Sequence, residues 1–445
     1  MSHYDLIIAG GTVVLPWGIV QTDLGIVDGR IASLSVGAAD AAHERFDARH
    51  LHVLPGLIDP HVHLRDPGDA SVESIPTGTR AALLGGITTV FDMPNTKPAI
   101  TDAATLDWKR DYAPRESHTD FGIYVGATRA NTPDLAEYEQ GRGVCAIKLF
   151  AGSSTGDLMI EDDAGIEAVM RAGARRIAFH SEDEYRLQER RKLFSVGDAF
   201  DNHRIWRDEE CAFLGTRRIM ALARKTGRPA HILHVSTAEE LDYLKDFRDI
   251  ATCEVLVNHL TQIAPECYET LGALAVMNPP IRDRRHYEAS WAAINDGTVD
   301  TIGSDHAPHP LSAKAKPWPE TPAGLTGVQT LVPVMLDHVN AGRTSLGRMV
   351  DLMAAGPARV YGLQGKGRIA AGYDADFTIV DLGARRRITN DWIVTPAGWT
   401  PFDGMEVAGW PVAAVLRGRV AMCDDMIVGP PCGRLARFAG ERIGD

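Results

Sequence analysis

Six side chains that could bind metal ions lie in or at the ends of apolar runs of this sequence: His61, His63, Lys148, His180, His234 and Asp305. His61 and His63 are two residues apart, so in a β-strand both imidazoles point to the same side and can reach one ion. Imidazole and carboxylate donors without a thiolate fit Zn²⁺, although Mn²⁺ or Co²⁺ could occupy the same donors. Six donors exceed the three protein ligands of a usual catalytic zinc site, which favours two metal ions with a bridging group.

Lys148 is the unusual member of this set, because an ammonium group between two cations would be repelled. A lysine carboxylated by CO₂ would instead offer two oxygens and could bridge the two ions. An unmodified lysine would be expected to form a salt bridge. Asp157, Asp162 and Asp163 in the following loop are alternative bridging carboxylates.

The apolar runs that carry these residues alternate with helix-like stretches along the middle of the chain. The runs cover residues 54–64, 88–95, 121–128, 146–152, 176–182, 229–236, 251–259 and 300–309. The amphipathic stretches between and after them include residues 73–84, 160–173, 204–225, 238–247, 286–295 and 329–338. Eight strands, each followed by a crossover, predict a (β/α)8 TIM-type barrel of the α/β class. Functional groups of such a barrel lie at the carboxyl ends of its strands, where the six candidate ligands stand.

Both ends of the chain have a different sequence pattern, with short β-rich segments separated by glycine turns such as Gly10-Gly11 and Asp28-Gly29. Neither end carries many apolar residues by itself. We therefore predict that residues 1–54 and 366–445 pair into one small composite β-sandwich domain. The barrel is predicted to cover residues 55–365.

Composition excludes several classes of function. The chain has 445 residues, 44% hydrophobic and 24% charged, which is typical of a globular protein with a large core. The net charge of −13 and the lack of a basic run argue against nucleic acid or an anionic membrane as partner. No apolar run reaches the ~18 residues of a membrane span, and no secretory signal is evident. Six scattered cysteines without a CxxC pair predict free thiols in a reducing cytoplasm.

Two motifs resemble the signatures of a known family. The run from Gly56 to Gly68 resembles the first signature of the dihydroorotases, in the cyclic amidohydrolase branch of the amidohydrolase superfamily. The run from Gly303 to His309, with Lys314 shortly after it, resembles the second. Residues 92–96, 179–183, 233–237, 277–282 and 367–382 are similar to further segments of the family. The resemblance thus extends over the whole predicted barrel.

This resemblance implies a dinuclear zinc site. His61, His63, Lys148 and Asp305 would hold one ion, and Lys148, His180 and His234 the other, with Lys148 carboxylated as in those members that use a lysine. Asp305 would also shuttle a proton. The implied reaction is the reversible cyclisation of N-carbamoyl-L-aspartate to L-dihydroorotate in de novo pyrimidine biosynthesis. The resemblance further implies a homo-oligomer, a dimer or tetramer, and suggests aspartate transcarbamoylase as a protein partner.

Four residues are expected to contact the substrate. Arg65 follows His63 by two residues on the same strand face and is placed to bind a carboxylate bidentately. Asn95 and His309 follow the second and eighth runs and could reach the same anion, while Asn278 could contact the ring. Allantoinase-like chains resemble this one in their metal ligands but typically lack this arginine and the Pro-Asn-Thr run.

Two other functions compete with this interpretation. One is another cyclic amidohydrolase, such as an allantoinase or a hydantoinase (dihydropyrimidinase), whose substrates lack the ring carboxylate. The other is a catalytically inactive barrel that serves as a scaffold, which predicts broken ligand sets. The sequence departs from many dihydroorotases at Asn258, where a first histidine commonly stands, and we interpret the adjacent His259 as structural.

Overall fold

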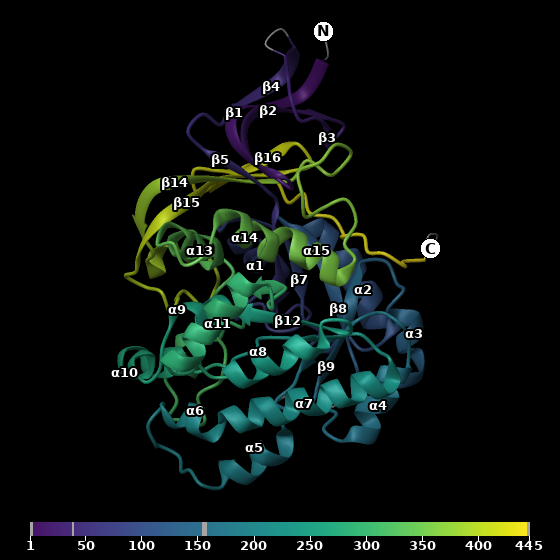
Figure 1. Cartoon of the computed structure of the whole chain (residues 1–445), viewed down its shortest axis with the longest axis vertical. Helices are drawn as coiled ribbons and strands as arrows, with labels where there is room; N and C mark the ends of the chain where they lie inside the picture. The colour runs from purple at the N-terminus through teal and green to yellow at the C-terminus, as the bar shows by residue number, and fades with distance from the viewer. Residues whose placement is uncertain (1–2, 38–39, 154–157, 443–445) are drawn as a thin grey trace.

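The computed structural model of the chain describes residues 3–37, 40–153 and 158–442. Its strands form two sheets, and in Figure 1 the sheet built from N-terminal and C-terminal strands caps a helix-covered barrel. The parallel strands of the barrel are β6 (Leu57–Val62), β7 (Ile87–Asp92), β8 (Asp120–Gly126), β9 (Val144–Phe150), β10 (Ile177–His180), β11 (Ala230–Ile232), β12 (Ala251–Leu256) and β13 (Thr301–Gly303). Neighbouring strands pair in chain order, so the predicted (β/α)8 barrel is confirmed.

The barrel closes where its first and last strands meet. Val62 and His306 form an isolated parallel bridge, and the His63 amide donates to the His306 carbonyl at 2.8 Å. Closer to the barrel interior, the buried Asp59 carboxylate accepts from the Ser304 amide at 3.1 Å and from its hydroxyl at 2.5 Å. The carboxyl ends of β6 and β13 are therefore fixed to one another.

Several helices begin at a residue whose side chain caps them. Ser74, Asp102, Asp208 and Thr237 each accept a hydrogen bond from a backbone amide in the first turn of the helix that follows. The helices are α1 (Ile75–Leu84), α2 (Ala103–Glu116), α3 (Leu135–Tyr138), α4 (Asp163–Arg171), α5 (Glu184–Arg191), α6 (Asn202–Trp206), α7 (Glu209–Thr226), α8 (Ala238–Leu244), α9 (Val257–Thr261), α10 (Glu266–Leu271), α11 (Arg284–Asp296), α12 (Leu311–Lys314), α13 (Leu331–Asn340), α14 (Leu346–Val350) and α15 (Gly356–Tyr361). In the described part of the chain, no helix is long and apolar enough to cross a bilayer.

Three predicted segments each contain parts of two elements in the structure. The run 54–64 contains parts of two strands, because the chain leaves the mixed sheet at Gly56 and enters the barrel at Leu57. A Cβ at position 56 would lie 2.4 Å from Thr88 Oγ1, so this close approach requires glycine. The run 251–259 ends as a strand at Leu256 and continues as α9. The stretch 204–225 is divided between α6 and α7 at the Asp208 cap.

The two chain ends form one mixed sheet, which confirms the predicted composite β-unit. Its strands are β1 (His3–Leu15), β2 (Gly18–Val27), β3 (Arg30–Ser33), β4 (Ala41–Asp47), β5 (His52–Pro55), β14 (Phe377–Arg387), β15 (Glu406–Leu416), β16 (Arg419–Cys423) and β17 (Met426–Ile427). The N-terminal and C-terminal parts meet where β5 pairs antiparallel with β14, with Leu54 opposite Thr378. In Figure 1, α13, α14 and α15 lie between this sheet and the barrel.

A buried charge cluster ties the C-terminal segment to the amino end of β8. Lys366 Nζ lies 2.5 Å from Asp120 Oδ2 and 3.3 Å from Asp374 Oδ2, and it also pairs with Asp376. Arg417 approaches Asp120 at 2.5 Å. Burial would lower the pKa of Lys366, but the carboxylates, Asp120 first, raise that pKa above its ordinary value. Lys366 therefore carries the charge that compensates these buried carboxylates.

Replacing this lysine is expected to destabilise the fold. Lys366→Met removes the cation that pairs with Asp376 and leaves Asp120 with a single counter-charge, so it should lower the free energy of unfolding by about 3–5 kcal/mol. The control is Lys225→Met, because Lys225 pairs with Glu167 at 2.6 Å but has a side chain that is 59% exposed. That change should cost less than about 1 kcal/mol. Urea unfolding followed by circular dichroism measures both, and equal shifts of the midpoint would contradict the assigned role of Lys366.

Candidate active site

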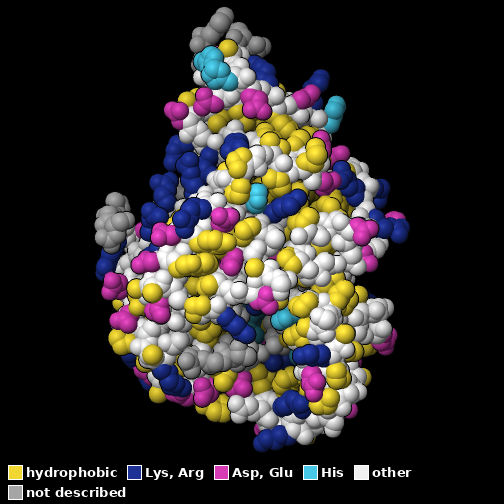
Figure 2. Space-filling view, turned by 180° about the vertical axis from the view of Figure 1, so that it is seen from behind, with side chains coloured by type: hydrophobic (Ala, Val, Ile, Leu, Met, Phe, Trp, Pro, Cys, Tyr) yellow, Lys and Arg dark blue, Asp and Glu magenta, His cyan; other side chains and the backbone are white. Residues whose placement is uncertain are grey.

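One cavity of about 230 Å³ at the carboxyl ends of the barrel strands receives all ten residues predicted to bind metal or substrate. These are His61, His63, Arg65, Asn95, Lys148, His180, His234, Asn278, Asp305 and His309. Figure 2 shows the molecule hollowed in its lower half, with histidine side chains visible there between Lys and Arg side chains. Residues from six strand ends and two loops thus face the same space.

His61 and His63 present matching ring nitrogens to Asp305. His61 uses Nδ1 to contact Glu254 Oε1 at 2.8 Å, and its Nε2 lies 3.2 Å from Asp305 Oδ1. His63 uses Nδ1 to contact Asn95 Oδ1 at 2.6 Å, and its Nε2 lies 3.0 Å from the same Asp305 oxygen. Ligand atoms of the three residues lie within 4.8 Å of one another, which is close enough for one ion.

A second group of donors lies beside the first. The His180 ring is centred 4.6 Å from that of His234, which is centred 5.5 Å from that of His61. His180 Nε2 contacts Glu182 Oε2 at 2.8 Å, so its Nδ1 is left for a ligand. Arg207 holds the Glu182 carboxylate in place through Nε at 3.1 Å.

Lys148 completes the second group. It is 1% exposed, and among the described residues no carboxylate lies within ion-pair distance of its Nζ, which sits 4.5 Å from the centre of the Phe150 ring. The expected salt bridge of an unmodified lysine is therefore absent from the part of the chain that the structure describes. Burial lowers the pKa of Lys148 to about 7, although Asp305 and Glu254 oppose the shift. A sizeable share of this amine is thus neutral near pH 7.

The alternative bridging carboxylates are engaged elsewhere. Asp162 accepts from the Gly165 amide at 2.9 Å and caps α4, and Asp163 pairs with Arg218. Asp157 lies outside the described residues.

Burial would lower the pKa of His61, but the charges of Asp305 and Glu254 outweigh it and raise that pKa. Burial keeps the other three candidate histidine ligands neutral. It lowers the pKa of His63 to about 4, against the opposing effect of Asp305, and it holds the pKa of His234 well below the ordinary value. Burial would raise the pKa of Asp305, but His61 and then His63 hold it well below the usual range. Neutral imidazoles and an ionised carboxylate are the forms that bind metal.

Three of these residues sit in strained backbone. Arg65, His234 and Asp305 have φ values of 58°, 39° and 46°. Residues other than glycine rarely adopt the left-handed region, and such strain is concentrated at functional sites. In each case the turn directs a side chain from the end of a strand into the cavity.

The substrate-binding candidates are held by specific partners. The Asn278 amide oxygen accepts from His203 Nε2 at 2.9 Å, and its nitrogen donates to Ser153 Oγ at 2.9 Å. His309 Nε2 donates to the Ala323 carbonyl at 3.1 Å. Burial, followed by the charge of Arg65, lowers the pKa of His309 to about 3, so this ring is neutral.

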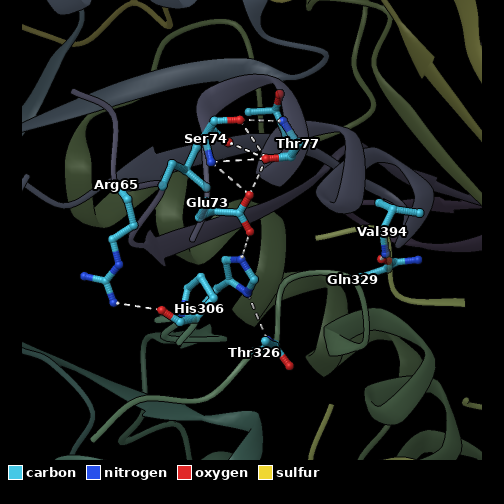
Figure 3. Close-up of polar contacts among 12 residues, drawn as sticks. Arg65, Glu73, Ser74, Thr77, His306, Thr326, Gln329 and Val394 are labelled. Atoms are coloured by element: carbon cyan, nitrogen blue, oxygen red, sulfur yellow. Dashed lines mark hydrogen bonds and ion pairs between the residues drawn. The ribbon is translucent and has the colours of Figure 1, made fainter. Parts of the chain in front are cut away.

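Arg65 has no ion-pair partner among the described residues. Within the described parts of the chain, its guanidinium makes one long hydrogen bond, 3.5 Å to the Pro308 carbonyl. Figure 3 shows this contact beside a separate network, in which the His306 ring lies between Glu73 and the backbone next to Thr326. His306 Nε2 is 2.9 Å from Glu73 Oε2, and its Nδ1 accepts from the Gly327 amide at 3.1 Å. His306 is therefore a structural histidine, because both of its ring nitrogens are occupied.

Sequence reasoning missed the carboxylates behind the ligands. Glu254 is fully buried in β12, where it accepts from His61 and, at 3.2 Å, from the His234 amide. Glu182 supports His180 in the same way. The available signal was an acidic residue within or just after an apolar strand run, because such a carboxylate needs a buried partner. His259, interpreted as structural, lies 3.1 Å from the Pro279 carbonyl through Nε2.

Comparison with known proteins places this site in a family. Residues 52–421 match the Amidohydrolase family. The chain belongs to this family. This amidohydrolase is 35% identical over 428 residues to a dihydroorotase of Pyrococcus furiosus, covering 96% of the chain and 95% of the relative. It is 32% identical over 458 residues to an allantoinase of Rubrobacter xylanophilus, covering 99% of each.

A solved structure shares the whole architecture of this amidohydrolase. An L-hydantoinase (dihydropyrimidinase) from Arthrobacter aurescens superimposes with a TM-score of 0.94 at 26% identity, covering 98% of the chain and all of the hydantoinase. Relatives with three different names therefore resemble the chain over nearly its full length. The fold and family are the same in each comparison, so the choice between substrates depends on individual side chains.

The donor set of the amidohydrolase site fits divalent metal ions. His61, His63 and His180 share one arrangement. In each, one ring nitrogen contacts a side-chain oxygen, and the other ring nitrogen faces the cavity. This arrangement fixes the tautomer and the ring orientation of a metal ligand. The donors form two neighbouring groups, with His61, His63 and Asp305 in one and His180 and His234 in the other.

The Glu254 carboxylate is expected to control metal affinity. Glu254→Gln keeps the shape of the side chain but weakens the charged partner of His61, which should lower zinc affinity about 10–100-fold. Zinc competition with a chromophoric chelator measures the change.

Glu240→Gln is the matched control, because Glu240 is also buried but contacts Thr216 at 2.7 Å and Thr237 at 2.9 Å rather than a candidate ligand. Its zinc affinity should equal that of the unaltered protein. Equal affinities in both variants would exclude a metal-supporting role for Glu254.

Proposed function

We propose that this amidohydrolase is a dinuclear zinc dihydroorotase, which interconverts L-dihydroorotate and N-carbamoyl-L-aspartate in de novo pyrimidine biosynthesis. The observation that carries the proposal is the guanidinium of Arg65, which lines the metal-ligand cavity without a carboxylate partner among the described residues. Dihydroorotate has a ring carboxylate that such a group would bind. Allantoin, hydantoin and dihydrouracil lack a carboxylate in that position.

Charge considerations support this choice. Burial lowers the pKa of Arg65, and Asp305 only partly opposes the shift, so the guanidinium is a desolvated cation with too little compensation. A bound carboxylate would supply that compensation through two charge-assisted hydrogen bonds. Asn95 and the neutral His309 line the same cavity and would add uncharged polar contacts to the anion.

The relatives alone leave the substrate open, because dihydroorotases and an allantoinase resemble the chain at 35% and 32% identity. The L-hydantoinase structure supports the alternative of a ring without a carboxylate. A catalytically inactive scaffold is disfavoured, since all six candidate ligands are present and line one cavity. Cytoplasmic location, a homo-oligomeric state and association with aspartate transcarbamoylase are parts of the proposal that follow from the resemblance.

The residues of the site would have different roles in ring opening. Two zinc ions, when bound, would supply Lewis-acid activation of water and of the amide carbonyl. Asp305, ionised and next to both histidines of the HxH pair, accepts a proton from the attacking water. The same carboxyl group then donates that proton to the ring nitrogen as the C–N bond breaks. Arg65, Asn95 and His309 hold the carboxylate, and Asn278 orients the ring.

The reverse reaction follows by microscopic reversibility. Asp305 accepts a proton from the carbamoyl nitrogen as that nitrogen attacks the carboxyl carbon. Asp305 then donates this proton to the departing oxygen, which leaves the carboxyl carbon as water. Asp305 therefore has the same position in both directions. Its strained backbone and its contacts to His61 and His63 fix that position.

The proposal is tested with rings that differ by one carboxylate. Zinc-loaded protein should open dihydroorotate in strong preference to dihydrouracil, hydantoin and allantoin. Arg65→Met should lower kcat/KM for dihydroorotate about 100-fold, because a charge-assisted bidentate contact is lost, and should leave the rate with dihydrouracil nearly unchanged. Preference of the unaltered protein for an uncharged ring would overturn the dihydroorotase assignment in favour of a hydantoinase or allantoinase.

A control separates this effect from a general loss of positive charge. Arg285 lies on α11 and pairs with Glu239 at 2.6 Å, with a side chain that is 56% exposed. Arg285→Met should leave kcat/KM for both substrates within about twofold of the unaltered protein, as expected for an exposed pair.

Carboxylation of Lys148 predicts a dependence on CO₂ and pH. Only the neutral amine reacts with CO₂, and the pKa of Lys148 is about 7. Reactivation of metal-free protein by zinc plus bicarbonate should therefore accelerate as the pH rises through 7, and should be slow in CO₂-free buffer. Carbon-13 NMR of protein reactivated with ¹³C-bicarbonate measures the adduct directly. Full activity and two bound zinc ions in Lys148→Met would contradict the bridging role.

A further inference from the structure

Lys314 is a buried lysine at the end of α12 that the proposed reaction does not use. It is 1% exposed, and its Nζ donates to the carbonyls of Val276 at 3.1 Å, Pro322 at 2.9 Å and Gly324 at 3.2 Å. An ammonium group has three donors, whereas a neutral amine has two. The three acceptors therefore match the protonated form and leave none of its hydrogens unused.

These acceptors belong to segments 276–278 and 322–324, which form one wall of the substrate cavity. Gly324 lines the cavity, as does its neighbour Ala323, and Val276 stands two residues before the lining residue Asn278. The Gly324 amide donates to the Val276 carbonyl at 3.0 Å, so the two segments are also joined directly. Lys314 does not line the cavity itself. It lies behind the wall and connects both of its segments.

The wall packs directly against His309. His309 Nε2 contacts the Ala323 carbonyl at 3.1 Å. Gly324 has a φ of 143°, and a Cβ at this position would lie 2.4 Å from the Ala307 carbonyl oxygen and 3.0 Å from the His309 ring. Gly324 is thus packed closely against Ala307 and His309. A shift of segment 322–324 would displace His309 and change the shape of the cavity.

Stability alone does not explain a lysine at this position. Among the described residues no carboxylate lies within ion-pair distance of Lys314, and burial lowers its pKa to about 7. A buried cation without a counter-charge costs free energy, and an apolar side chain of similar volume would fill the space without that cost. The contacts that offset this cost are the three oriented hydrogen bonds and the face of the Trp399 ring, whose centre lies 5.8 Å from Nζ; of these, only the hydrogen bonds reach the cavity segments.

We propose that Lys314 is a positioning residue, whose three hydrogen bonds hold segments 276–278 and 322–324 so that Asn278 and His309 keep the geometry that binds the substrate ring and its carboxylate. The inference rests on the proposed function of the same site, and it assigns Lys314 an effect on substrate binding rather than on the chemical step.

The test compares two replacements of Lys314. Lys314→Met removes all three donors, and Lys314→Gln retains two N–H groups without the charge. The KM for dihydroorotate should rise about tenfold or more in the Lys314→Met variant, because the three buried carbonyls lose their donors. It should rise by less in the Lys314→Gln variant. The kcat should stay within about threefold and the zinc content should be unchanged, which is the pattern of lost binding. If the Met variant does not fold, the Gln variant provides the measurement.

Lys366→Met is the matched control, since it makes the same change at a buried lysine near the amino end of β8, away from the cavity. It should lower stability without raising KM. An unchanged KM in folded Lys314 variants, or a fall of kcat together with zinc loss, would overturn the positioning role. If the unaltered protein prefers an uncharged ring, the proposed function fails, and the KM for that preferred ring then tests Lys314 independently.

Discussion

The contact between the first and last strands of the barrel is the constraint on which the candidate centre depends. His61 and His63 lie at the end of β6, and Asp305 lies just beyond β13, almost the full length of the barrel sequence away. The Asp59 carboxylate, buried between them, accepts from the Ser304 amide and hydroxyl and from the His61 amide at 3.2 Å. The barrel therefore has to close for the three ligand atoms to meet.

Buried carboxylates then set the properties of the histidines. Glu254 and Glu182 contact one nitrogen of His61 and His180, and Asn95 does the same for His63 through an amide oxygen. The difference has a chemical meaning, because a carboxylate partner makes an imidazole a stronger electron donor than an amide partner does. The ion proposed at His61 and His63 would thus be held by two histidines of unequal basicity.

The sequence was sufficient to predict the barrel, the composite β-unit and the convergence of the ten candidate residues on one cavity. These predictions rest on local patterns, namely apolar runs, the two-residue spacing of His61 and His63, and motifs. The run 54–64 joined the end of β5 to β6, because apolar residues continue from one sheet into the other without interruption. The roles of Glu254 and His306 could not be predicted, since each depends on a partner more than 190 positions away in the chain.

The pairing of β5 with β14 has a consequence for synthesis of the chain. Residues 52–55 leave the ribosome early. Their partners at 377–380 are synthesised much later, and only the last strands of the sheet follow them. For most of translation the outer edge of β5 has no strand beside it, and open edges are sites of unwanted association. β4 pairs with β1 on the same side as β5, and its exposed residues His43, Glu44 and Arg45 include charges that disfavour pairing of this neighbouring strand with other chains. The N-terminal strands can therefore complete their sheet only after almost the whole barrel has been synthesised.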